Sequence, residues 1–342
     1  MAISAKLQRR LDELRKTHES QFNDAFLEAI QTIKDDVPLA AIVEAIERGE
    51  FETVVSLLGI DRAAFRPLEQ ASAALFEAAG TATASTLQAS SRVRRGRGAQ
   101  AAFRFDIRNT RSENWLRDQS SGLVTRVVED TRNAVRLRLQ EGMVKGSNPR
   151  ATALDIIGRI DPGTQRRTGG IVGLSGPQEQ WLRNARDEIA GGDLRNYLNR
   201  KARDKRFDSH VNKALRDGTP IPADVQAKMV ARYNDNLLKL RGETIARTES
   251  IHALNQAQNE SMLQAVETGT VRKVRKIWDS AGNDGRTRES HLELDGVSVP
   301  INEPFISPAT GKAMMFPLDT SLGAEGEDVI NCRCRIRYDV DF

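Results

Sequence analysis

The 342-residue sequence contains only two cysteines, Cys332 and Cys334, and aromatic residues make up only 5% of it. Two cysteines cannot build a disulfide framework, and their scarcity is typical of a chain made in a reducing compartment. No stretch approaches the ~18 uninterrupted apolar residues that a membrane-spanning helix needs. The opening MAISAKLQRRLDELRK has charges where a signal peptide has its apolar core, so we expect no export by that route.

Charge is distributed unevenly along the chain. Residues 92–217 carry 27 basic and 15 acidic side chains, whereas the regions 1–91 and 241–342 are both net acidic. An arginine-rich block of this kind is typical of contact with a polyanion, either nucleic acid or an acidic protein surface. The alternative is a set of solvated helices whose arginines pair with neighbouring carboxylates.

One short segment within this block has arginines but no acids. Four arginines fall within six residues, and two glycines, Gly96 and Gly98, lie beside them. This composition predicts a flexible basic arm rather than a helix face, which would bind DNA or an acidic partner nonspecifically. No aromatic residue is interleaved, so base stacking is not expected. The four residues are Arg92, Arg94, Arg95 and Arg97.

Apolar residues recur at helical spacing over most of the chain. They predict helices over about 3–33, 38–49, 50–58, 67–80, 121–141, from Pro177 onward, 193–200, 207–217 and 222–268. The stretch 80–100 is predicted to be a linker or loop because it consists mainly of Thr, Ala, Ser, Gly and Arg. The apolar stripe of the first helix is either a core face or a surface for a partner.

The pattern changes after Gly269. Short apolar segments that alternate with long Gly- and Pro-rich loops predict small β elements, the last from Ile330 to Tyr338. The sequence therefore predicts a mainly α fold, with helical N-terminal and middle regions and a small α+β C-terminal domain. We place the boundaries at 1–91, 92–217 and 218–342.

The two cysteines and a histidine are the residues best suited to hold a metal ion. In the predicted strand, Cys332 and Cys334 point to one face because side chains alternate. With His291 they would begin a tetrahedral zinc site, with His252 or Asp295 as the fourth ligand. The alternative is that both thiols are buried as small hydrophobes and His291 is an unrelated structural residue. A Cys–His nucleophile is less favoured, because no helix N-terminus lies beside either thiol to activate it.

Several motifs of the C-terminal third resemble a known family. They are ARTESIHALNQAQ at 246–258, KIWDS at 276–280, RTRESHLELDG at 286–296 and NCRC at 331–334. In order and spacing these resemble the phage Mu F-like family of minor head proteins, also called head morphogenesis proteins. The resemblance implies a polar motif cluster made of Arg247, Thr248, Glu249, Arg288 and Asp295.

The resemblance also implies a function. Such a protein is a structural minor head protein of a tailed phage or prophage, made in the host cytoplasm and located in the virion, in the head interior or at the portal vertex. Its expected partners are the portal protein, the major capsid or scaffold protein, and packaged or ejected double-stranded DNA, but no membrane. No catalysis is expected. The alternatives are a nonspecific nucleic-acid-binding protein and, less favoured, a metal-dependent or Cys/His hydrolase.

Overall fold

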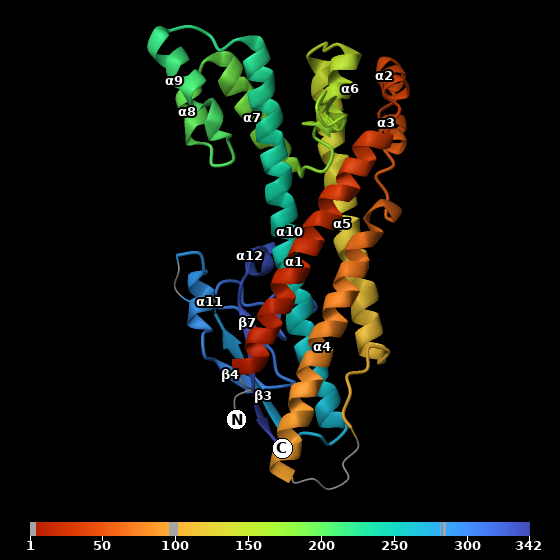
Figure 1. The fold of residues 1–342 in the computed structure, drawn as a ribbon, viewed down its shortest axis with the longest axis vertical. Coiled ribbons are helices and arrows are strands. Elements are labelled where there is room, and N and C mark those ends of the chain that lie inside the picture. The colour runs from red at the N-terminus through yellow and green to blue at the C-terminus, as the bar shows by residue number, and fades with distance from the viewer. Residues whose placement is uncertain (1–4, 96–101, 281, 283–284) are drawn as a thin grey trace. The chain divides into compact units, whose positions relative to one another are not determined.

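The computed structural model of the chain describes residues 5–95, 102–280, 282 and 285–342 (Figure 1). Its contacts divide the chain into two compact units. Unit 1 gathers the described residues of 1–23, 68–121 and 243–342, and unit 2 gathers those of 24–67 and 122–242. Each unit is therefore assembled from stretches that are far apart in sequence. The division of the sequence at residues 91 and 217 stays a prediction.

Helices dominate the described residues and confirm the mainly α fold. The α-helices are α1 (Ala5–Asp36), α2 (Leu39–Glu47), α3 (Phe51–Leu57), α4 (Arg66–Arg95), α5 (Thr110–Val144), α6 (Pro149–Ile157), α7 (Gly176–Gly191), α8 (Leu194–Asn199), α9 (Asp208–Asp217), α10 (Ala223–Glu267), α11 (Glu289–Glu293) and α12 (Gly326–Val329). Two short 3₁₀ helices, η1 (Ala63–Phe65) and η2 (Lys205–Phe207), precede α4 and α9.

Local signals fix many of the helix ends. Ser175 begins α7 with a capping box. In it, the backbone N–H of Ser175 donates a hydrogen bond to the side-chain oxygen of Gln178. Gly192 and Gly218 follow α7 and α9 in the left-handed conformation that glycine adopts without strain. Helix α6 was not predicted; Asn148 caps its start by accepting from the backbone N–H of Ala151.

The predicted loop over residues 80–100 is wrong for residues 80–95, because α4 continues through Gly80 to Arg95. Small hydroxyl side chains fit inside this helix by donating hydrogen bonds to the carbonyl four residues earlier. Thr83, Thr86 and Ser90 all do so, at 2.9 Å each. Gly80 is not a helix stop but a point of close packing, as its carbonyl accepts from Ser261 of α10.

Helices α1, α4 and α10 pack together in unit 1. Leu7 and Leu11 from α1 meet Phe76 and Ala79 from α4, and Leu254 of α10 joins the same cluster. Leu7 and Leu11 are each 2% exposed. The apolar stripe at the start of α1 is therefore a core face, and the structure does not leave it open for a partner.

A small antiparallel sheet packs on the C-terminal half of α10 (Figure 1). Its strands are β3 (Lys273–Asp279), β4 (Ser298–Pro300) and β7 (Arg335–Asp341), in the order β4-β3-β7. Strand β3 pairs with β7 along its whole length, from Lys273 opposite Asp341 to Asp279 opposite Arg335. The strands β5 (Phe305–Ile306) and β6 (Ala313–Met314) form a separate hairpin.

A glycine-rich loop, residues 169–175, links β2 (Arg167–Thr168) to α7 in unit 2. Strand β2 pairs antiparallel with β1 (Arg159–Ile160), which is also two residues long. A Cβ on Gly173 would lie 2.7 Å from Leu238 and 2.8 Å from Ile30, so only glycine fits this close approach. Arg241, 7% exposed, donates to the Gly173 carbonyl at 2.8 Å and so anchors the loop to α10.

Candidate functional site

Three ligand-bearing side chains meet in the interior of unit 1. The sulfurs of Cys332 and Cys334 lie 3.4 and 3.5 Å from the same atom, Nδ1 of His291. All three ligand atoms lie within 4.8 Å of one another. His291 is 1% exposed, Cys332 2% and Cys334 1%. The structure therefore brings together the three residues that the sequence predicted as a metal cluster, which we call the Cys–His cluster.

The strand that was expected to present the cysteines begins later than predicted. Strand β7 starts at Arg335, so Cys332 and Cys334 lie in the turn before it and do not share a strand face. Asn331 adopts a positive φ of 59°, a conformation that Asn tolerates better than most residues. The backbone N–H of Cys332 then donates to the Val329 carbonyl at 3.1 Å. This tight turn, rather than strand alternation, directs both thiols toward His291.

Neither predicted fourth ligand joins the cluster. His252 of α10 stands edge-on to Trp115 and near Phe316, with ring centroids 5.4 and 5.8 Å apart. Asp295 is exposed, and its carboxylate accepts from the backbone N–H of Ser280 at 2.8 Å. Helix α11 ends at Glu293, so Asp295 lies beyond the helix that carries His291.

The carboxylate near His291 is one that the sequence did not single out, Asp328. Its Oδ1 lies 4.0 Å from Nε2 of His291, and both side chains are 1% exposed. Ser307 and Thr310 each donate a hydroxyl hydrogen bond to this carboxylate at 2.7 Å. Asp328 lies on α12, four residues before Cys332. Its closeness to the cysteines in sequence was the available signal.

The two thiols form a tightly coupled pair. The hydrogen bond with Cys332 lowers the pKa of Cys334 to about 5, and the nearby imidazole of His291 adds to this lowering. The same hydrogen bond, together with burial, raises the pKa of Cys332 well above its ordinary value. The first proton therefore leaves the pair more readily than the second.

Three residues of the motif cluster hold the turn that carries the cysteines. Arg247 donates to the Oδ1 of Asn331 at 3.3 Å, and the hydroxyl of Thr248 accepts from the Asn331 backbone N–H at 3.2 Å. Arg288 donates to the Ile330 carbonyl at 2.6 Å. These contacts come from α10 and from the residue before α11, and they fix the turn from two sides.

The other two motif residues lie elsewhere. Glu249 is 6% exposed and accepts from the side-chain amide of Gln119 on α5 at 2.6 Å. Asp295 holds the backbone after β3, as described above. The five motif residues therefore do not converge on one point. They support different parts of the same unit.

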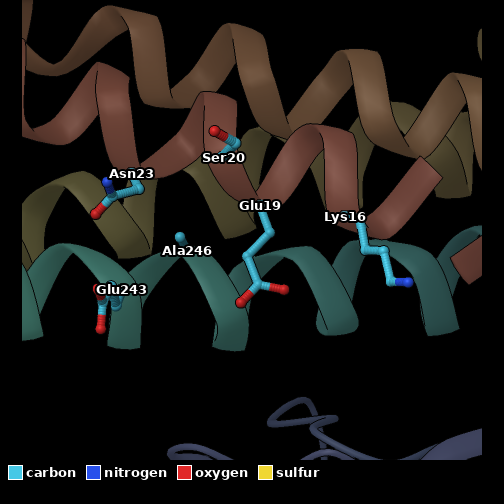
Figure 2. Close-up of a pocket in the computed structure, with 6 residues that line it drawn as sticks. All are labelled: Lys16, Glu19, Ser20, Asn23, Glu243 and Ala246. Atoms are coloured by element: carbon cyan, nitrogen blue, oxygen red, sulfur yellow. The ribbon is translucent and has the colours of Figure 1, made fainter. Parts of the chain in front are cut away.

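A shallow groove of about 310 Å³ adjoins this region along α1 and α10 (Figure 2). Glu19 reaches across it from α1, where its carboxylate pairs with Arg15 at 2.6 Å and lies 3.6 Å from Nε of Arg247. The guanidinium groups of Arg15 and Arg247 therefore neutralise the carboxylate of Glu19. The groove is lined by Lys16, Glu19, Ser20, Asn23, Glu243 and Ala246.

The predicted arginine arm is described only in part. Arg92, Arg94 and Arg95 belong to the last turn of α4, so at these three positions the backbone is helical rather than a loop. Arg97 lies outside the described residues. Among the described residues, no helix combines the length and the apolar composition that a membrane span requires.

Comparison with known proteins identifies the C-terminal region. Residues 183–337, somewhat less than half of the chain, match a family model described as "Phage Mu protein F like protein". The match begins within α7 and ends within β7, so it includes the Cys–His cluster and all five motif residues. This region is therefore similar to the Mu F-like family of phage head morphogenesis proteins.

One curated relative is the uncharacterized protein YqbB of Bacillus subtilis (strain 168). It is 34% identical over 101 residues, which are 30% of this chain and 31% of the relative. The chain thus matches about a third of the length of that relative. No solved structure matches the chain.

Proposed function

We propose that this protein is a minor structural component of a tailed-phage or prophage head, which associates with the portal or inner capsid during head assembly. The observation that carries the proposal is the Mu F-like match over residues 183–337. The proposed setting is assembly in the bacterial cytoplasm, followed by residence in the head interior or at the portal vertex. The portal protein and the major capsid or scaffold protein are the proposed partners.

The use of the motif residues supports a structural rather than a catalytic role. The polar groups of Arg247, Thr248 and Arg288 form hydrogen bonds with the backbone and a side chain of one turn, at Ile330 and Asn331. The Cys–His cluster beside them is at most 2% exposed, so a substrate has no access to it. An enzyme site instead needs a concave, accessible surface with convergent polar groups.

The proposal is tested on particles. Phage or prophage particles are induced from a host that carries an epitope-tagged copy of the gene, and procapsids and mature heads are separated by density. Immunoblotting is expected to find the tagged chain in at least one of the two fractions, at low copy relative to the major capsid protein. Its absence from both fractions would refute the proposal.

The partner is tested on the same material. Cross-linking followed by mass spectrometry is expected to join lysines of this chain to the portal protein or to the inner face of the capsid. Cross-links confined to host proteins would contradict the proposed location. A tagged cytoplasmic protein of similar size, expressed in the same host, controls for carry-over in the gradient.

A further inference from the structure

The spacing of the Cys–His cluster matches a metal shell. Zinc binds thiolate sulfur at about 2.3 Å and imidazole nitrogen at about 2.0–2.1 Å, so a tetrahedral shell separates sulfur from nitrogen by roughly 3.6 Å. The two sulfur-to-Nδ1 distances are 3.4 and 3.5 Å. The two sulfur-to-nitrogen distances therefore need little change for these atoms to close around an ion.

We propose that Cys332, Cys334 and Nδ1 of His291 bind one zinc ion. A protein-only account of the cluster is poorer. A neutral imidazole nitrogen has a single lone pair and accepts one hydrogen bond well, yet two sulfurs lie against the same Nδ1. A cation between the three atoms satisfies all of them at once. Two thiolates with one imidazole suit zinc better than the oxygen-seeking Mg²⁺ or Ca²⁺.

The opposite ring nitrogen of His291 supports the same assignment. Its Nε2 is buried and has no hydrogen-bond partner, while the Asp328 carboxylate lies 4.0 Å away. When Nδ1 binds a metal, Nε2 carries the proton and needs an acceptor, which is the carboxylate–histidine–zinc arrangement. A small rotation of the imidazole completes it, since Ser307 and Thr310 hold Asp328 in place.

The surrounding backbone completes the second layer of contacts. The N–H of Cys334 donates to the sulfur of Cys332 at 3.4 Å, which stabilises negative charge on that sulfur. Arg247, Thr248 and Arg288 hold the turn at Ile330 and Asn331, immediately before the first cysteine. The Mu F-like motif residues thus position the ligand turn even though they do not touch the ligand atoms.

Three ligands come from this chain. No fourth His, Cys, Asp or Glu among the described residues joins the group, which leaves one position of a tetrahedral shell for water. The ion would tie α11 to the turn that leads into β7, and β7 in turn pairs with β3 over seven residues. Its role is structural, because it clips together a region of short strands and long loops.

The first test measures metal in the full chain, expressed with zinc in the medium and purified with reductant and without chelator. We expect about one zinc per chain, falling at least ~10-fold in Cys332→Ser and Cys334→Ser. His210→Gln is the matched control, because His210 is exposed on α9. We expect this variant to keep the wild-type zinc content. Zinc that stays at about the wild-type level in both cysteine variants would overturn the proposal.

A second measurement does not depend on whether the variants fold. X-ray absorption at the zinc edge of the wild-type protein is expected to show about two sulfur neighbours at ~2.3 Å and about two nitrogen or oxygen neighbours at ~2.0 Å. Zinc without sulfur neighbours refutes the assignment. So does a wild-type chain that is purified metal-free and takes up no Zn²⁺ in reductant.

Discussion

Gly80 in the middle of α4 offers the sharpest test of the packing in unit 1. A Cβ at this position would lie 2.4–2.6 Å from three ring atoms of Phe105, a distance that real Cβ atoms do not show. Gly80→Ala therefore has two opposed effects. It stabilises the helix by about 1 kcal/mol through propensity. It also overpacks the contact with Phe105, which costs about 1–3 kcal/mol.

The two effects separate in a double-mutant cycle. In the wild-type background, the substitution should lower the free energy of unfolding by about 0–2 kcal/mol. In a Phe105→Ala background the ring is gone, so the same substitution should raise that free energy by about 1 kcal/mol. The expected coupling between the two positions is therefore about 1–3 kcal/mol.

The assay must report on unit 1, because a chain of two units need not unfold in one step. Trp115 stacks on Phe76 at a ring separation of 4.9 Å, and Trp278 is fully buried beside β7. Both belong to unit 1, whereas the half-exposed Trp181 belongs to unit 2. Urea unfolding followed by tryptophan fluorescence in a Trp181→Phe background therefore monitors the correct unit.

Thr81→Ala is the matched control, since Thr81 is the next residue of the same helix and is exposed. It should raise stability slightly through propensity and to the same extent with or without the Phe105 ring. A Gly80–Phe105 coupling within about 0.5 kcal/mol of zero, the range expected for independent sites, would refute the packing argument.

Two further predictions concern charge. Burial lowers the pKa of Lys276 to about 8, from 10.5 when free. Between these values the folded state binds fewer protons than the unfolded state, so wild-type stability should rise with pH there relative to Lys276→Met. Parallel urea midpoints of the two proteins from about pH 7 to 10 would contradict this. For the arginine arm, four neutralised phosphates give a slope of log K against log salt of about −3.6 on duplex DNA. Its quadruple Ala variant should lose most of that slope, and an unchanged slope would exclude the arm as the contact.

Helix positions were largely readable from the sequence because their signals are local. Pro38 and Gly49 bracket α2, and Ser175 begins α7, as their residue types predict. The prediction was wrong where tertiary packing decides the outcome. At Gly80 the residue type suggested a stop, but the ring of Phe105 fills the place of the missing side chain and the helix continues.

The candidate site shows the same limit. The sequence identified His291, Cys332 and Cys334 from their chemistry alone, and the structure brings them together. The predicted geometric reason, a shared strand face, was wrong because a left-handed turn at Asn331 precedes the cysteines and β7 begins only at Arg335. Asp328 was missed since its proximity to His291 depends on how α12 packs against α11, which no periodicity encodes.

The interleaved make-up of unit 1 has a consequence for synthesis of the chain. Asp12 of α1 pairs with Arg335 of β7 at 2.6 Å, although 323 positions separate them. At about 5–20 residues per second, a ribosome adds the second partner roughly 16–65 s after the first. Leu7 and Leu11 wait roughly 12–50 s for their α10 neighbours Leu254 and Ala257, which are added before Arg335. The apolar face of α1 is thus completed by a helix that is synthesised more than 200 residues later, so part of this face stays exposed while the intervening chain is made.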